Sequence, residues 1–230
     1  MKAPTAVVIG SGVGGLAAAI RLRQKGYCVK VLERLEQPGG RASVIQSNGY
    51  TFDMGPTIIT APFLLQELWA IFGERFEDHV DLRRMDPFYR IRFSDGSHFD
   101  YFGDALRMRQ EVQRVSPIDL PGYDSFMREA ERCYVLGYEE LGTVPFNRFS
   151  ELIAAIPSMM RMRAWESIYA MACRHFQNDK LRQVFSFHPL LIGGNPLSVT
   201  CVYSLIAALE RRFGVHSAMG GTGKIVREMA

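Results

Sequence analysis

The sequence predicts an α/β fold built around a strand, a glycine loop, a helix and a second strand at the N-terminus. Residues 5–9 (TAVVI) are a β-branched, apolar run, which is typical of a buried parallel strand. The run ends at the glycine cluster GSGVGG, and residues 16–26 (LAAAIRLRQKG) then hold strong helix formers up to a terminal glycine. Residues 27–33 (YCVKVLE) predict the second strand. Together these segments indicate a Rossmann-like βαβ layer.

The rest of the chain predicts further structure added to this layer. Residues 62–73 (PFLLQELWAIFG) indicate a helix with a proline in its first turn and a glycine at its end. Residues 88–102 alternate with period two around SDGS and predict a β-hairpin, with Asp95 and Gly96 supplying the positive φ angles of the turn. From about Pro121 to Phe213 the pattern is mostly helical. We therefore expect a nucleotide-binding layer with an inserted hairpin and a helical block.

The composition indicates a folded globular protein without a nucleic-acid partner. Hydrophobic residues make up 47% of the 230 residues and charged residues 22%, both ordinary values. The 27 basic and 24 acidic residues give a net charge of +3, which is too small for a dedicated nucleic-acid binder. The cysteines form no C-x-x-C pair and have no histidine at metal-ligand spacing, so we expect reduced thiols and no metal site.

The N-terminal apolar run predicts neither an export signal nor a membrane span. Its glycines would break a signal helix, and Arg21, Arg23 and Lys25 follow where a small-residue cleavage site would be needed. No window without charges reaches the length of a transmembrane helix. We expect a protein that does not span the membrane.

The glycine loop carries the first functional signal. Gly10, Gly12 and Gly15 fit G-x-G-x-x-G, with Gly14 between them, and the motif lies between a predicted strand and a predicted helix as it must. The first glycine permits the tight turn, the second lets the backbone approach a pyrophosphate, and the third lets helix and strand pack closely. Glu33 ends the second strand, where an acid accepts hydrogen bonds from ribose hydroxyls and disfavours a 2′-phosphate. The motif predicts a dinucleotide and leaves NAD and FAD both open.

A second glycine pair favours FAD over NAD. Gly39-Gly40-Arg41 follows the strand and its acid, an order that resembles the flavoprotein superfamily of the amine oxidases and carotenoid desaturases. The resemblance implies that the pair lets the chain fold back over FAD, with the arginine near the phosphates and the flavin end. Guanidinium suits phosphate and glycine avoids collision with a large ligand, so the physical argument agrees. The alternative is a plain Pro-Gly-Gly turn with a solvated arginine.

Longer segments resemble the bacterial and fungal-type phytoene desaturases, also called carotenoid dehydrogenases. FDMGPTIIT (52–60) is similar to their D-x-G-P-T segment, as are residues 137–146, 181–198, 203–215 and 220–226 in the same order. The resemblance implies an FAD-dependent enzyme that removes hydride and a proton from C–C bonds of an acyclic carotene such as phytoene. It also implies that the G-P-T residues of this segment, Gly55, Pro56 and Thr57, join the cofactor site.

The sequence assigns no catalytic residue. Asp53, His175 and His188 are conceivable proton acceptors, but none forms a recognisable acid–base pair. His188 lies among aromatic residues in FSFHPL, where a core histidine with both nitrogens satisfied is the better interpretation.

A basic, methionine-rich region spans residues 148–182. Its cations are Arg148, Arg161, Arg163, Arg174, Lys180 and Arg182. Cations beside Met, Trp and Tyr suit a helix at an anionic membrane surface, and a C40 hydrocarbon substrate must come from lipid. An amphipathic core helix with a solvated basic face explains the pattern equally well. With the first interpretation, the protein is cytoplasmic and peripherally associated with the cytoplasmic membrane.

The predicted organisation has an FAD-binding part at residues 1–80, a strand segment of a substrate domain at 81–115, a helical insertion at 116–215 and a return to the FAD-binding domain at 216–230. Members of the resembled family continue well beyond this point, so we expect an N-terminal portion that is incomplete at the C-terminus and inactive alone. The alternatives are another flavin oxidoreductase of the superfamily (an amine oxidase, a carotenoid isomerase or an oxygenase), or an inactive truncated fragment.

Overall fold

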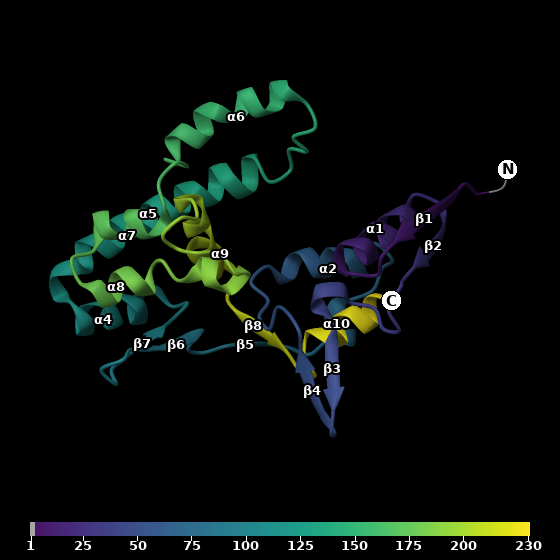
Figure 1. Ribbon diagram of the computed structural model, residues 1–230, viewed down its shortest axis with the longest axis horizontal. Helices are drawn as coiled ribbons and strands as arrows, with labels where there is room; N and C mark the ends of the chain where they lie inside the picture. The colour runs from purple at the N-terminus through teal and green to yellow at the C-terminus, as the bar shows by residue number, and fades with distance from the viewer. Residues whose placement is uncertain (1–2) are drawn as a thin grey trace. The chain divides into compact units, whose positions relative to one another are not determined.

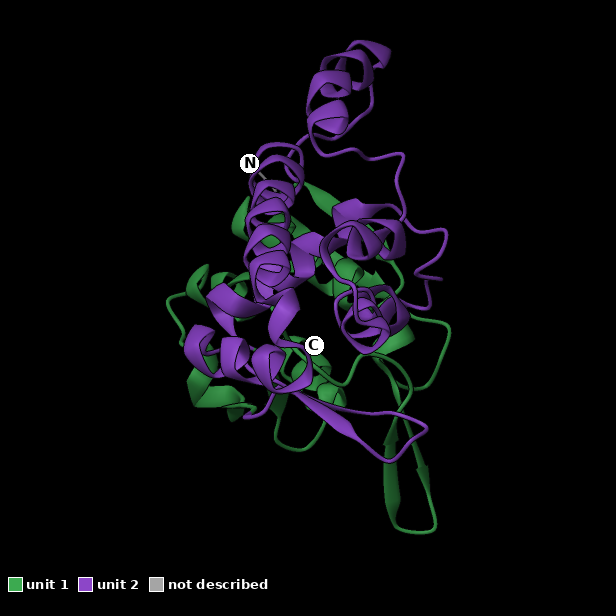
Figure 2. Ribbon diagram, turned by 90° about the vertical axis from the view of Figure 1, so that its left-hand side faces the viewer, with its two compact units in different colours: residues 1–85, 215–230 green, residues 86–214 purple. Residues whose placement is uncertain are grey.

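The computed structural model describes residues 3–230, which form two compact units (Figure 2). Unit 1 combines the chain up to Met85 with Val215–Ala230, and unit 2 is Asp86–Gly214. The chain thus leaves unit 1 once and returns to it near the C-terminus.

Unit 1 contains the predicted βαβ arrangement (Figure 1). Strand β1 (Thr5–Ile9) pairs in parallel with β2 (Cys28–Leu32), and helix α1 (Val13–Gln24) connects them and packs on both. At the end of α1, Gly26 adopts φ +85°, and the amide of Tyr27 donates to the carbonyl of Leu22 at 3.2 Å. This is a Schellman motif, in which glycine takes the left-handed position that ends the helix. The predicted α/β fold is confirmed.

Helix α1 begins at Val13 and not at Leu16, where the run of strong helix formers starts. The first turn therefore contains Gly14 and Gly15. Because glycine has low helix propensity, the sequence pattern placed the start of the helix after these two residues. At Gly15 tertiary packing overrides this propensity, because only a residue without a side chain fits where α1 crosses the loop.

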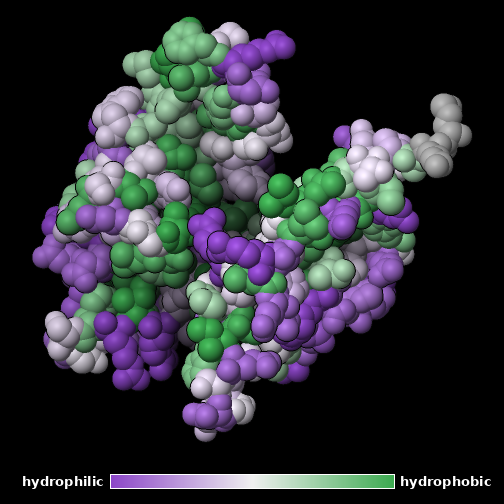
Figure 3. All heavy atoms as spheres, turned by 45° about the vertical axis from the view of Figure 1, so that its right-hand side comes forward, coloured by the Kyte–Doolittle hydropathy of each residue, from purple (hydrophilic) through white to green (hydrophobic). Residues whose placement is uncertain are grey.

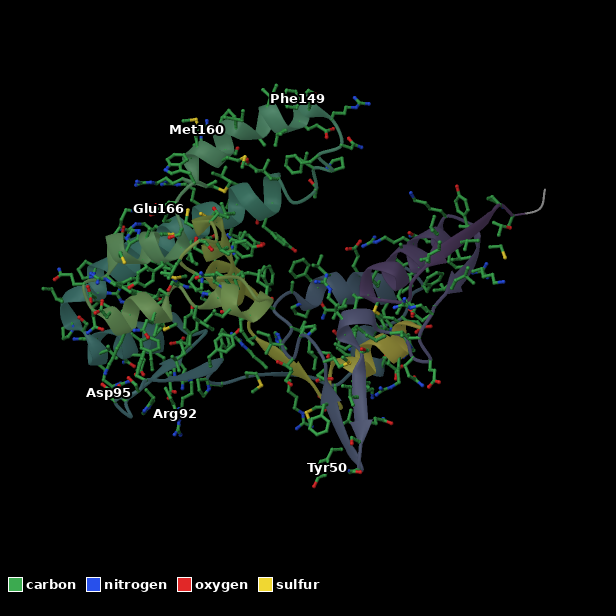
Figure 4. All side chains as sticks on the ribbon, viewed as in Figure 1. Tyr50, Arg92, Asp95, Phe149, Met160 and Glu166 are labelled. Atoms are coloured by element: carbon green, nitrogen blue, oxygen red, sulfur yellow. The ribbon has the colours of Figure 1, made fainter. Side chains whose placement is uncertain are left out.

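A short hairpin follows the second glycine pair. Gly40–Ala42 form one 3₁₀ turn, and β3 (Val44–Ser47) then pairs antiparallel with β4 (Tyr50–Asp53). Asn48 and Gly49 close the hairpin with φ +51° and +82°, the left-handed pair that a two-residue type I′ turn requires. Figure 4 labels Tyr50 beside this turn. This hairpin is an addition to the elements predicted from the sequence.

The remaining elements of unit 1 enclose its core. They are α2 (Pro62–Ala70), α3 (Phe76–His79), β5 (Leu82–Arg84), β8 (His216–Ala218) and α10 (Thr222–Met229). β5 pairs antiparallel with β8, and the core holds residues from near both ends of the chain, such as Leu16 and Met229. Trp69 and Phe76 belong to this core and pack edge to face at 4.9 Å between ring centroids.

Unit 2 begins with the predicted hairpin, β6 (Tyr89–Arg92) and β7 (His98–Tyr101), which pair antiparallel. Its turn differs from the prediction, because only Gly96 has a positive φ, +82°. The amide of Gly96 donates to Phe93, and the amide of Phe93 donates to Ser97 at 2.9 Å. These contacts are typical of a type I turn followed by a left-handed glycine, so Asp95 needs no left-handed conformation.

Helices make up most of unit 2. They are α4 (Ala105–Val115), α5 (Leu120–Cys133), a π-helix (Tyr134–Glu140), α6 (Phe149–Arg161), α7 (Ile168–His175), α8 (Asp179–Val184) and α9 (Leu205–Phe213), with 3₁₀ turns at Pro117–Asp119, His188–Ile192 and Cys201–Ser204. The mostly helical character of the region after Pro121 is confirmed. α4 lies in the segment for which only strands were predicted, and Asp104 caps it by accepting from the amide of Arg107 at 2.8 Å.

The core of unit 2 is aromatic and also holds the polar side chains of Glu210 and His188. Phe176 and Phe185 stack at 4.7 Å between centroids with 11° between ring planes. Glu210 is fully buried and accepts from the Tyr89 hydroxyl at 2.6 Å, while its other oxygen lies 3.2 Å from Nε2 of His188. Within residues 3–230, no helix is both long enough and apolar enough to cross a membrane.

Candidate dinucleotide-binding site

The first glycine loop is shaped by close backbone contacts. Gly10 has φ +96°, and its amide donates to the carbonyl of Leu32 at 2.7 Å, which ties the end of β1 to β2. A Cβ on Gly15 would lie 2.1 Å from the carbonyl oxygen of Gly10, a distance that no side chain tolerates. A Cβ on Gly14 would meet nothing within 4 Å. Gly15 therefore has the predicted role of close helix–strand packing, whereas the protein alone does not require glycine at position 14.

The second glycine pair lies directly against the first loop. The amide of Gly39 donates to the carbonyl of Ser11 at 2.9 Å, and Gly12 and Gly39 form a parallel bridge. A Cβ on Gly40 would lie 3.4 Å from the Cα of Gly12. The two glycine motifs, separated in sequence by a helix and a strand, thus form one continuous backbone surface.

The N-terminus of α1 opens on this surface. Its N-cap is Gly12, no side chain caps it among the described residues, and its first turn holds no acid. Uncapped amides and the helix dipole favour a negative group at such an end. Arg41 is exposed, follows Gly40 directly and forms no ion pair within residues 3–230. The surface therefore offers backbone amides and one guanidinium to an anion.

Glu33 lies at the end of β2 and accepts hydrogen bonds from four donors. The amides of Leu35 and Arg34 donate to Oε1, and the hydroxyl and amide of Ser11 donate to Oε2. These bonds, that of the Leu35 amide first and those of Ser11 next, lower the pKa of Glu33 to about 2. Glu33 is therefore ionised at neutral pH and fixed beside the glycine loop, as a ribose-binding acid must be.

The D-x-G-P-T segment reaches the same place from the hairpin β3–β4. A Cβ on Gly55 would lie 1.9 Å from the carbonyl oxygen of Arg41, so the two backbones are in direct contact. Pro56 and Thr57 are exposed and continue toward Ile59, which pairs with His216. Of the predicted cofactor residues, the glycines, Glu33 and Arg41 are thus brought together, and Pro56 and Thr57 follow them on the surface.

Two contributions to the site were missed by sequence reasoning. Ser11 occupies a variable position of the motif, so nothing marked its double contact with Glu33. Asp53 was considered as a proton acceptor, but its Oδ2 accepts from the amide of Thr222 at 3.3 Å. The sequence signal for the contact of Asp53 was the GGTG run at residues 220–223, in the segment predicted to return to the FAD-binding domain.

The conceivable proton acceptors are all engaged within the protein. Asp53 contacts α10, and Nε2 of His175 lies 2.8 Å from Glu129. His188 is a core residue, as predicted, but only Nε2 has a partner, and Nδ1 is buried without one. The expectation that both nitrogens are satisfied is therefore wrong. No general base follows from this geometry.

The fold and the joined glycine motifs define a dinucleotide-binding protein, and comparison with known proteins gives the family. Residues 13–230 match the family described as flavin containing amine oxidoreductase. A phytoene desaturase (neurosporene-forming) of Cereibacter sphaeroides is 46% identical over 228 residues, which are 99% of this chain and 44% of the relative. A phytoene desaturase (lycopene-forming) of Pantoea ananas is 43% identical over 222 residues, 96% of this chain and 45% of the relative. The chain therefore belongs to the family of flavin-containing amine oxidoreductases.

The chain spans less than half the length of these curated relatives. Among solved structures, wild-type putrescine oxidase bound to putrescine superposes with a TM-score of 0.60 at 18% identity, covering 100% of this chain and 49% of that protein. At this level of identity the likeness shows the fold alone.

The family implies FAD as cofactor, in agreement with the prediction from the two glycine motifs. The residues present fit the group. A Cβ on Gly12 would meet only the carbonyl oxygen of Gly39 at 3.8 Å and the Cα of Gly40 at 4.0 Å, which are ordinary contacts. Because the protein does not itself require glycine there, a ligand that approaches the backbone closely explains the residue.

Proposed function

We propose that this chain is the FAD-binding and substrate-contacting part of a carotenoid desaturase that acts on an acyclic carotene such as phytoene. The contact between Gly12 and Gly40 is the structural observation that carries the proposal, because it joins the two motifs into one dinucleotide surface. The substrate class rests on the relatives of 43–48% identity over nearly the whole chain, which are named phytoene desaturases.

The residues of unit 1 have distinct tasks in this proposal. The ionised carboxylate of Glu33 holds the ribose hydroxyls, the uncapped start of α1 holds the pyrophosphate, and Arg41 adds a positive charge beside it. The bound flavin supplies the acceptor of a hydride taken from a C–C bond. The protein positions the substrate and excludes water around it.

A lipid surface as partner is supported by α6 in unit 2. Ala155 is its only buried residue, and the helix exposes many large apolar side chains: Phe149, Leu152, Ile153, Ile156, Met159 and Met160. Hydrophobic residues gather over α6 at the top of Figure 3, and Figure 4 labels Phe149 and Met160 near its two ends. A core helix would bury such residues, so an apolar partner outside the described chain explains them better.

The cations of the region 148–182 do not contribute equally to this surface. Several form ion pairs with carboxylates: Arg163, Arg174, Lys180 and Arg182. Arg148 and Arg161 are exposed and lie at the two ends of α6. Apolar side chains flanked by cations suit an anionic bilayer, so we place the protein peripherally at the cytoplasmic membrane.

Other flavin oxidoreductases, such as an amine oxidase, a carotenoid isomerase or an oxygenase, would use the same nucleotide site. The substrate that is converted distinguishes a carotenoid desaturase from these enzymes. Residues 1–230 would replace the matching 44% of the Cereibacter sphaeroides relative, and the chimera would be expressed in cells that accumulate phytoene. We expect coloured polyenes, lost on Gly12→Val. A folded chimera that retains flavin but leaves phytoene unchanged, while the parent relative converts it, contradicts the proposal.

A further inference from the structure

Asp53 sits over the start of a helix from the other end of the chain. It ends β4, and its Oδ2 accepts from the amide of Thr222, the first residue of α10, at 3.3 Å. Gly221, the N-cap of α10, has φ +79° and forms no cap of its own. A Cβ on Gly221 would lie 2.7 Å from Oδ1 of Asp53. The carboxylate thus takes the place of a missing N-cap side chain, where the helix dipole favours negative charge.

The residues next to Asp53 connect this contact to the second glycine motif. The amide of Met54 donates to the carbonyl of Ser43 at 3.0 Å, and Gly55 rests on the carbonyl of Arg41. A Cβ on Gly223, in the first turn of α10, would lie 2.4 Å from Cγ1 of Val44. Close contacts therefore join three segments: residues 41–44, the start of the D-x-G-P-T segment and the first turn of α10.

This contact leaves polar atoms without partners. Oδ1 of Asp53 and Oγ1 of Thr222 are buried and have no hydrogen bond among the described residues, and Thr222 is only 4% exposed. An unpaired buried polar group costs about 1–3 kcal/mol, so these two atoms lower the net stabilisation that the contact between Asp53 and Thr222 gives.

We propose that Asp53 is a positioning residue of the cofactor site. It accepts from the start of α10 and thereby fixes residues 41–44, so that Arg41 and the Gly39-Gly40 backbone keep their place against the first glycine loop. The inference rests on the proposed binding of FAD to this surface. It assigns Asp53 a role different from proton transfer, because the carboxylate acts through Arg41 and does not need to touch a substrate.

The test compares Asp53→Ala and Asp53→Asn with the unchanged chain. The control is Asp81→Ala, which removes an exposed carboxylate paired with Arg83 in the same unit. FAD affinity is measured by quenching of flavin fluorescence, and hydrogen exchange is followed for the amides of α10 and of α1. We expect Asp53→Ala to weaken FAD binding about tenfold or more and to speed exchange in α10 but not in α1. Asp53→Asn keeps an oxygen acceptor and should stay within about threefold.

The outcomes distinguish a failure of the proposed FAD binding from a failure of the role proposed for Asp53. A folded wild-type chain that binds no FAD counts against the proposed function, and exchange in α10 then tests Asp53 alone. Wild-type affinity in Asp53→Ala, unchanged exchange in α10, or an asparagine variant as weak as alanine overturns the inference. If the alanine variant does not fold, Asp53→Asn decides, because affinity retained within threefold supports the inference and its loss overturns it.

Discussion

Ser11 donates both its backbone amide and its hydroxyl to Oε2 of Glu33, at 2.7 and 2.6 Å. The amides of Arg34 and Leu35 occupy Oε1, at 2.8 and 3.0 Å. An ionised carboxylate has about four lone-pair positions, so all of them are used within the protein. A ribose hydroxyl must displace one donor, and the Ser11 hydroxyl is the one that can rotate away. Ser11 therefore competes with the nucleotide for Glu33.

Removing this competitor should strengthen nucleotide binding. We expect Ser11→Ala to bind ADP about twofold to fivefold more tightly, because one acceptor position on Glu33 becomes free. Glu33→Gln should weaken ADP about tenfold, since a neutral amide accepts less well and presents a donor to the ribose. Isothermal titration calorimetry measures both, with Ser47→Ala, an exposed serine of β3 in the same unit, as a matched serine control. Weaker binding by Ser11→Ala would show that the hydroxyl assists the nucleotide instead.

The same hydrogen bonds make the stability of unit 1 depend on pH. The pKa of Glu33 is lowered from 4.5 to about 2 in the folded state, so its stabilising contribution is complete above pH 4.5 and is lost as the pH falls toward 2. Glu33→Gln should therefore flatten the acid limb of the stability curve within this window. Trp69 fluorescence in a Trp165→Phe background reports on unit 1, which contains Trp69 in its core. Identical acid limbs for the two proteins would contradict the assignment.

The parts of the site that were predictable from sequence are those that depend on local motifs. A few neighbouring residues are enough to recognise the G-x-G-x-x-G loop, Glu33 at the end of a strand, and the Gly39-Gly40-Arg41 turn. The hairpin β3–β4 carried such a signal too, since Asn48-Gly49 favours a type I′ turn, but its four-residue strands lack clear alternation. β5 and β8 could not be predicted, because three-residue strands that lie far apart in the sequence have no local pattern. The contact of Asp53 with Thr222 likewise arises only from tertiary packing.

The glycines of the first loop should respond differently to alanine, because their surroundings differ. Gly15→Ala places a Cβ against a backbone oxygen at 2.1 Å and should destabilise unit 1 by more than about 3 kcal/mol. Gly14→Ala meets open space in a helical turn and should stabilise it by about 0.5–1 kcal/mol. Gly12→Ala should fold normally yet lose FAD, and Gly12→Val should retain none. Thermal unfolding and flavin absorbance of the purified variants measure these effects, and full flavin in Gly12→Val would refute the assignment of the loop.

Membrane binding should depend on α6 and its unpaired cations. We expect Phe149→Ser with Met160→Ser to reduce sedimentation with anionic vesicles strongly, since both side chains are exposed, 76% and 60% respectively. Arg161→Gln should weaken binding and reduce its salt dependence, whereas the control Arg182→Gln removes a cation already paired with Asp179 and should not. Equal sedimentation of the wild-type chain with neutral and anionic vesicles at every salt concentration would argue against an anionic membrane partner.

The buried contacts of Glu210 in unit 2 should be costly to disturb. Glu210 and His188 have no exposed surface, and the Tyr89 hydroxyl is the donor to Oε1 of Glu210. Tyr89→Phe leaves that oxygen without a donor in a site that water does not reach, which should cost about 1–3 kcal/mol. His188→Ala removes the other partner of a buried carboxylate and should cost more, about 3–5 kcal/mol.

The half-buried Tyr203 is the matched control, and Tyr203→Phe should change stability by less than about 0.5 kcal/mol. Hydrogen exchange of the α9 amides, which include that of Glu210, measures the local free energy of opening. Exchange in Tyr89→Phe as slow as in the control would mean that the phenol contributes nothing to holding this carboxylate.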